Sequence, residues 1–227
     1  RSALVIGEVA LSLTLIVSAG LLVRSLAYLN GLNPGFDTHD VLTAQTSLQD
    51  ARYSTRGAVN GLFTKGLERI TRIPGVESAG VALTLPFERP LNDGVAALDG
   101  KDNQPQITEV VYVTPGYFET MRIPVLDGRA FHDSDTADTR NVALVSASFA
   151  KKRFPGRNAV GRHLSYLSRG NPREIVGVVA DIQQHSGMGN YGPLSVTPTV
   201  YVPVAQTNDR YLQAVHTWFA PKWVVRA

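Results

Sequence analysis

The chain has 227 residues and no cysteine, which excludes disulfides, thiol catalysis and zinc sites built from thiolates. Its 22 basic and 19 acidic residues leave a formal net charge of +3, which is too balanced and too evenly spread to predict nucleic-acid binding. Hydrophobic residues make up 44% of the chain and charged residues 18%, so the sequence can bury a core.

An apolar stretch over residues 3–23 dominates the start of the chain and contains one charged residue and no proline. As a helix of about 21 residues it would reach about 31 Å, close to the hydrocarbon thickness of a bilayer. We therefore expect a transmembrane helix. A cleavable signal peptide is one alternative, but it has a shorter apolar region and a small-residue cleavage site. A core helix of a soluble protein is another, but it seldom needs a stretch that is apolar on every side.

Glu8 is the charged residue within this stretch. A carboxylate inside a bilayer costs a few kcal/mol unless it faces protein or water. Glu8 therefore either packs against other membrane spans or lies near the lipid headgroups, and the sequence leaves both open. Arg1 and Arg24 lie on opposite sides of the span, so the positive-inside rule does not orient it.

Beyond the span, the helix is expected to continue as a stalk to Leu29 and to stop at the breaker residues 33–35. Leu22, Leu26 and Leu29 follow each other at spacings of four and three, which places them on one side of a helix. The sequence predicts a narrow apolar stripe there.

Residues 41–83 predict a strand, a helix and a second strand. Residues 41–48 alternate, with Leu42 on the half-buried face, and residues 76–83 form the second strand. The helix is capped by Ser54 or Thr55 and is weakened by three glycines, so packing must hold it. Its apolar face consists of Val59, Leu62, Phe63, Leu67 and Ile70. Together these elements predict a helix covering a sheet.

Residues 84–220 are first rich in turns and then rich in strands, and we expect them to form a separate lobe. Pro203 demotes the last of the predicted strands to a sheet edge. The apolar residues 223–225 then open another strand, and with the missing initial methionine this predicts a fragment of a longer protein. The strands are expected at residues 95–98, 107–113, 142–145, 174–182 and 200–204, and the helices at residues 116–121 and 147–154.

Two motifs could suggest ligands. Gly187–Gly192 satisfies G-x-G-x-x-G, but the proline-containing sequence after it cannot start the helix that a dinucleotide site requires, so a loop is expected. Asp133, Asp135 and Asp138 lack the glycine and the bidentate glutamate of a calcium loop, so a solvated acidic turn is expected.

The remaining polar clusters do not predict chemistry. The five histidines are scattered without metal-ligand spacing, and Lys151–Arg153 is interpreted as a solvated helix end, where cations suit the helix dipole. No P-loop and no G-x-S-x-G motif occur. We therefore predict no catalytic residue, no cofactor and no metal.

Six segments together resemble one family of membrane proteins. Residues 18–53 resemble the first transmembrane segment and following strand of MacB/FtsX-type ABC transporter permeases, and most closely the acidobacterial group of duplicated orphan permeases. Further segments follow in the family's order and extend the resemblance over nearly the whole chain. They are RIPGVESAGVALTLPF, VTPGYFETMRIPVLDGRAF, VALVSASFAKKRFPGRNAVGRHL, REIVGVVADI and VYVPVAQ.

The resemblance implies an α+β fold, in which a transmembrane helix and stalk (residues 1–33) precede a two-lobed periplasmic core domain. Residues 34–83 would supply a βαβ unit of a porter-like lobe, residues 84–220 a β-rich lobe called Sabre, and residues 221–227 the start of a truncated return strand. The N-terminus would be cytoplasmic, the helix would span the bacterial inner membrane, and the domain would be periplasmic.

The function that the resemblance implies is non-catalytic: such domains pass ATP-driven motion across the membrane, for export or for mechanical work on a periplasmic partner. The implied partners are the lipid bilayer, an ATP-binding cassette subunit or domain, and a second permease half or a second copy. The membrane and stalk residues Glu8, Leu22, Leu26 and Leu29 would couple motion at the bilayer to the domain. A single-span sensor that holds a ligand between its lobes is the alternative.

Overall fold

The computed structural model describes residues 1–31, 33–100, 103–166, 171–184 and 195–227. These residues form two compact units, residues 1–33 and residues 34–227. The first unit is helix α1 (Ser2–Asn30), which is about 43 Å long at 1.5 Å per residue. Its segment Ser2–Tyr28, with a mean hydropathy of 2.1, is long and apolar enough to cross a bilayer.

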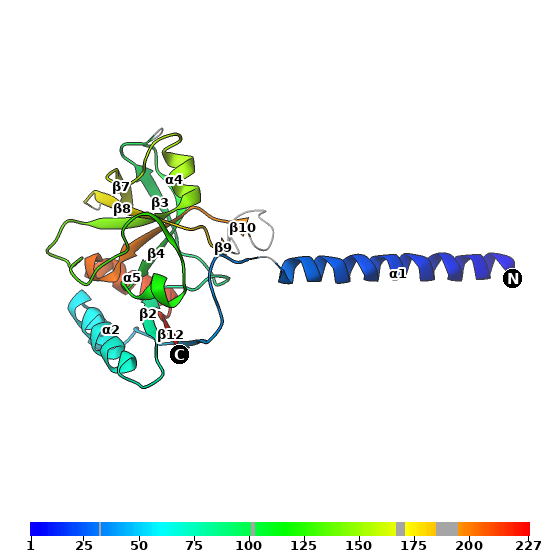
Figure 1. Cartoon of the computed structure of the whole chain (residues 1–227), viewed down its shortest axis with the longest axis horizontal. Coiled ribbons are helices and arrows are strands. Elements are labelled where there is room, and N and C mark those ends of the chain that lie inside the picture. The colour runs from blue at the N-terminus through cyan, green and yellow to red at the C-terminus, as the bar shows by residue number, and fades with distance from the viewer. Residues whose placement is uncertain (32, 101–102, 167–170, 185–194) are drawn as a thin grey trace. The chain divides into compact units, whose positions relative to one another are not determined.

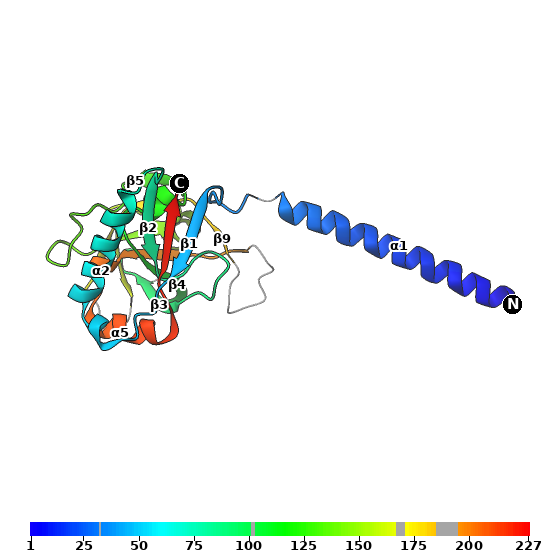
Figure 2. The same ribbon diagram turned by 90° about the horizontal axis from the view of Figure 1, so that it is seen from below.

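The second unit is built on a 10-stranded sheet (Figure 1). At one edge lie three antiparallel strands: β1 (Val41–Gln45), β12 (Lys222–Arg226) and β2 (Ser78–Ala82). Figure 2 shows β12 between β1 and β2, so the C-terminal strand joins two strands that lie more than 130 residues earlier in the chain. The predicted strand at residues 223–225 is confirmed as part of β12.

The rest of the main sheet closes into a ring. Each strand pairs with the next, and β3 pairs again with β4, so β4 both opens and closes the ring. β5 (Val125–Gly128) adds to the end of β8, and β9 (Gln183–Gln184) pairs separately with β10 (Ser195–Val196). The ring strands in order are β4 (Gln106–Val113), β11 (Thr199–Pro203), β6 (Val142–Ser146), β8 (Arg173–Val179), β7 (His163–Tyr166) and β3 (Asn92–Ala97).

β4 also connects the ring to the three edge strands. The register between β2 and β4 consists of one pair, Ala82 with Val113. Strands of both predicted lobes thus share one sheet, and residues 34–227 form one compact unit. The mixed α/β fold agrees with the fold class expected from the sequence. The predicted lobe boundary between residues 83 and 84 stays a prediction, and it would fall close to the single β2–β4 pair.

Helices cover the sheet, and their caps follow the sequence. Thr55 caps α2 by accepting a hydrogen bond from the Ala58 amide at 3.3 Å, and Ser146 caps α4 through the Phe149 amide at 3.3 Å. The helices are α2 (Arg56–Thr71), α3 (Tyr117–Thr120), α4 (Ala147–Arg153) and α5 (Asp209–Trp218), with short 3₁₀ turns at Ala51–Tyr53 and Val204–Gln206.

One hydrophobic core runs from α2 through the ring. Where α2 meets the edge strands, Phe63 packs edge-on against Trp223 with ring centroids 5.5 Å apart. Gly66 lies directly under the same indole, because a Cβ at this position would overlap Trp223. The prediction that packing holds this glycine-rich helix is therefore supported at Gly66, where the glycine is what allows the contact.

Two local predictions were wrong. β11 is not an edge strand: it lies between β4 and β6, and Pro203 is tolerated because it is the last residue of β11, beyond the residues that pair with β6. Leu42 is not half-buried but 69% exposed, because β1 lies at the edge of the sheet, where residues 42–45 are exposed on both faces.

Candidate functional site: an arginine clamp and an acidic cleft

The residues predicted to couple the span to the domain lie on α1. Glu8, Leu22 and Leu26 are exposed along this helix, and Leu22 is 71% exposed. The helix includes Leu29, whose side chain is outside the described part of the structure. Exposed apolar residues along a whole helix are what a bilayer or neighbouring spans would cover.

Residues 34–40, called the clamp segment here, follow the span and begin the second unit. Arg226 of β12 binds this segment, and its side chain is only 2% exposed. Its Nη1 donates to the His39 carbonyl oxygen at 2.6 Å and its Nη2 to that of Asp37 at 2.9 Å. Its Nε donates to the Thr120 carbonyl oxygen at 2.9 Å, so one buried guanidinium joins the clamp segment, β12 and the end of α3.

Arg122 grips the same segment from the surface. Its Nη1 lies 2.8 Å from Oδ2 of Asp37, and the Asp37 amide donates to the Met121 carbonyl oxygen at 3.0 Å. Hydrogen bonds from the amide and the ring of His39, together with Arg122 and the nearby Arg226, hold the pKa of Asp37 well below its usual range. Asp37 therefore stays ionised and paired at neutral pH.

The backbone of the clamp segment also docks on the domain. The Gln183 amide donates to the Pro34 carbonyl oxygen at 2.8 Å, and the Ala227 amide donates to that of Asp40 at 3.1 Å. Gly35 has a φ of 86°, and a Cβ there would overlap the Asp181 carbonyl oxygen. This position requires glycine for both reasons. The clamp segment is thus fixed along its length.

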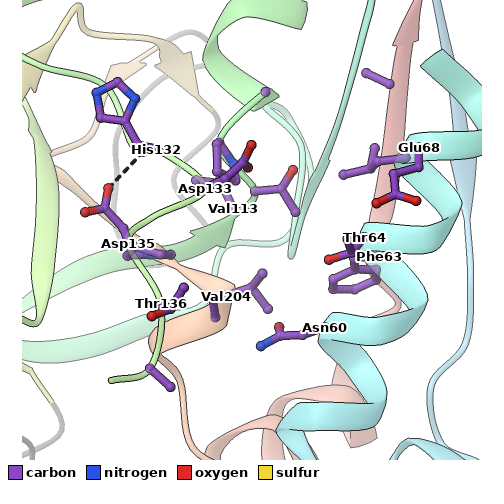
Figure 3. Close-up of a pocket in the computed structure, with 18 of the residues that line it drawn as sticks. Asn60, Phe63, Thr64, Glu68, Val113, His132, Asp133, Asp135, Thr136 and Val204 are labelled. Carbon is purple, nitrogen blue, oxygen red and sulfur yellow. Dashed lines mark hydrogen bonds between the residues drawn. The ribbon is translucent and has the colours of Figure 1, made fainter. Parts of the chain in front are cut away.

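A second feature is a cavity of about 700 Å³, called the acidic cleft here. Figure 3 shows it between α2 and the loop of residues 132–138, with Asn60, Thr64 and Glu68 projecting from α2 toward that loop. Phe63, Val113 and Val204 supply an apolar floor. Both walls belong to the second unit, and the cleft is wide enough for a drug-sized ligand.

The loop that forms one wall of the cleft is fixed by Asp135. Its carboxylate accepts two hydrogen bonds from Arg129, at 2.8 and 2.9 Å, and a third from the His132 amide at 2.8 Å (Figure 3). Burial raises the pKa of Asp135, but the bonds from Arg129 and His132 outweigh it and lower the pKa below its usual value. The prediction of a solvated acidic turn holds for Asp133 and Asp138, which are exposed, and was wrong for Asp135, which is 7% exposed.

Two further features singled out in the sequence are the basic helix end at residues 151–153 and the glycine motif at residues 187–192. Lys151 and Lys152 are exposed, but the solvated helix end was wrong for Arg153, whose buried side chain donates to the Gln104 carbonyl oxygen at 2.9 Å. It extends over the core because α4 packs on the ring, which a sequence pattern does not show. Gly187–Gly192 lies outside the described residues.

The described histidines differ in their surroundings. His39, His132 and His163 are exposed, while His216 is buried and bonds to the Tyr112 hydroxyl at 2.7 Å. His185 lies outside the described residues. Among the residues that the structure describes, no group of three or more His, Cys, Asp or Glu residues could hold a metal ion.

The sequence did not single out Asp37, Arg122, Arg226 or Asn60. A signal for Arg226 existed, because it ends an apolar strand in which a charge is unexpected, but its partners lie far away in the sequence. Asn60 gave no signal, since one asparagine on the polar side of a helix is ordinary.

These features define a class: a mixed α/β domain that follows an apolar helix able to span a membrane, with the connecting segment fixed to the domain. The family model of the MacB-like periplasmic core domain matches residues 2–227. The chain therefore belongs to the MacB-like periplasmic core domain family, as the resemblance had indicated.

One solved structure agrees with this fold. The periplasmic region of MacB from Actinobacillus actinomycetemcomitans matches at 14% identity and a TM-score of 0.52, over 85% of this chain and 76% of that chain. The extracellular domain of the noncanonic ABC-type transporter YknZ from Gram-positive bacteria matches at 15% identity and a TM-score of 0.47, over 82% of this chain and 83% of that chain. A comparison with curated proteins found no match.

Proposed function

We propose that the chain is the first transmembrane helix and the periplasmic core domain of an ABC transporter permease in a bacterial inner membrane. Its role is non-catalytic: it carries movement driven by ATP hydrolysis in the cytoplasm to the periplasmic domain, for export or for mechanical work on a periplasmic partner. Family membership and the apolar helix of residues 2–28 support this proposal.

The clamp is the observation that carries the proposal. Any movement of the span reaches the domain through the clamp segment, because that segment follows α1 in the chain. Arg226 and Arg122 tie it to β12 and to the end of α3. A displacement that reaches residues 34–40 is therefore delivered to the sheet rather than absorbed within that segment.

At the bilayer, α1 makes contacts through its leucine stripe and through Glu8. Leu22, Leu26 and Leu29 form the stripe against which another span or stalk packs, and Glu8 faces a polar group of a neighbouring span or the headgroups. The partners are the bilayer, an ATP-binding cassette subunit or domain, a second permease half or copy, and a periplasmic protein.

The stripe offers the test. The full-length protein that carries this chain would be assembled with its ATPase in nanodiscs, and hydrogen–deuterium exchange of residues 34–227 compared with and without ATP and vanadate. A triple variant in which Leu22, Leu26 and Leu29 are each changed to asparagine should keep ATP hydrolysis and lose the nucleotide-dependent change in exchange. Ala27→Asn, on the opposite side of the helix, is the matched control. An unchanged response in the triple variant would contradict the coupling role.

A further inference from the structure

The acidic cleft has the composition of a binding site for an organic cation. Its walls contain the carboxylates of Glu68, Asp133 and Asp138, none of which forms an ion pair with another described residue. Neither lysine nor arginine occurs among the residues that line it, although the chain as a whole is basic. A recess lined by one sign of charge over an apolar floor concentrates the field and attracts the opposite charge.

Asn60 provides an independent observation. Its Oδ1 is buried, and it has no hydrogen-bond partner among the described residues. A buried carbonyl without a donor costs about 1–3 kcal/mol, so a ligand that donates a hydrogen bond there is stabilised. In Figure 3 the Asn60 side chain projects from α2 into the space beside Val204.

The floor of the cleft selects for an apolar body. Phe63, Val113 and Val204 are fully or almost fully buried in the core and present their edges to the cavity. The volume of about 700 Å³ falls within the range of about 300–1,000 Å³ that is typical of small-molecule sites. A bare inorganic cation would leave this apolar surface uncovered.

We infer that the acidic cleft binds a small amphipathic organic cation, whose ammonium or guanidinium group donates to Asn60 and faces Glu68 and Asp133 while its apolar body lies on Phe63 and Val204. Such a head group carries donors only, so it matches the carboxylates and the Asn60 Oδ1 of the cleft, which are acceptors. The site belongs to the periplasmic domain and does not depend on the proposed coupling role.

The test uses three probes with one apolar body and different heads: 4-phenylbutylamine, 4-phenylbutanol and 4-phenylbutyrate. Calorimetric titration of the whole chain in nanodiscs at about pH 8, where the amine is protonated, is corrected with empty nanodiscs. The amine should bind about tenfold more tightly than the alcohol, and the carboxylate should not bind measurably. Increasing the salt concentration should weaken the binding of the amine and leave that of the alcohol unchanged.

Variants locate the site. Glu68→Gln and Asp133→Asn should each weaken binding of the amine about three- to fivefold without affecting the alcohol. Asn60→Leu should weaken binding of the amine at least as much, and exchange of residues 60–71 and 129–138 should slow when the amine binds. Glu119→Gln, which removes an exposed carboxylate outside the cleft, should leave the binding of the amine unchanged.

Three results would overturn the inference: equal affinity for the amine and the alcohol, loss of binding in Glu119→Gln to the same extent as in Glu68→Gln, or slowed exchange elsewhere in the domain. Binding of a lysine-containing peptide but not of the amine would assign the cleft to a protein partner and would also contradict it. Because all three probes are tested for binding alone, failure here leaves the coupling proposal standing.

Discussion

The Nη2 of Arg226 donates a hydrogen bond of 2.9 Å to the main-chain oxygen of Asp37, although 189 positions separate the two residues. The Arg226 side chain is 2% exposed and lies 3.6 Å from the Asp37 carboxylate. A strand near the C-terminal end of the chain thus fixes the segment that follows α1.

Replacing Arg226 with methionine should lower the free energy of unfolding by about 2–4 kcal/mol, because three carbonyl oxygens lose their buried donor and Asp37 loses a charge partner. Arg122→Met is the matched control, since that side chain is 53% exposed and its loss should cost less than about 1 kcal/mol. Urea unfolding of both variants measures the difference. Equal losses would contradict a special role for Arg226.

Two glycines of α2 should respond oppositely to alanine. Gly61→Ala meets no atom within 4 Å and should raise the free energy of unfolding by about 0.5–1 kcal/mol, because alanine favours the helix. Gly66→Ala should lower it by about 1–3 kcal/mol, because the new methyl group displaces the Trp223 indole. Thermal unfolding and tryptophan fluorescence measure both. Stabilisation by Gly66→Ala would show that α2 does not pack on Trp223 as described.

Glu109 should make the domain less stable as the pH rises. Burial raises the pKa of Glu109 to about 7, although the bond from Thr199 acts in the opposite direction. Since the pKa in the folded state exceeds that of the unfolded chain, the stabilisation is complete below about pH 4.5 and is lost as the pH rises through 7, by about 3 kcal/mol in all. Unfolding measured between pH 4.5 and 8 should show this loss in the wild type and not in Glu109→Gln. The same slope in both proteins would contradict it.

His216 should act in the opposite direction. Burial lowers the pKa of His216 to about 4. Because the unfolded chain binds the proton more readily, the stabilisation is present above about pH 6.5 and is lost as the pH falls through 4. His216→Gln should remove this acid sensitivity, whereas Tyr112→Phe should lose the 2.7 Å hydrogen bond and keep the sensitivity, since His216 stays buried. Acid sensitivity that persists in His216→Gln would assign it to another group.

Local elements were predictable where the signal lies within a few residues. Thr55, one of the two expected caps of α2, the apolar face around Phe63 and the long apolar helix α1 were all found from spacing and side-chain type. α5 was missed although Asn208 caps it and Tyr211, Leu212 and Val215 are spaced as a helix face.

The clamp and the cleft could not be predicted in this way, since both depend on contacts between distant parts of the chain. Arg226 meets Asp37 only because β12 inserts between β1 and β2, and the cleft forms only because the loop of residues 132–138 lies opposite α2. The same limit explains Pro203, whose place in the centre of the sheet depends on its position at the end of β11.

We propose that movement of the span reaches the domain through residues 34–40. The most direct measurement is hydrogen–deuterium exchange of the wild-type full-length protein with its ATPase in nanodiscs, compared between the nucleotide-free state and the state trapped with ATP and vanadate. Exchange should change with nucleotide in residues 34–40, 117–123 and 222–226. Arg226→Met should keep ATP hydrolysis but lose the change beyond residue 40. Identical exchange in the wild-type domain in both states would contradict it.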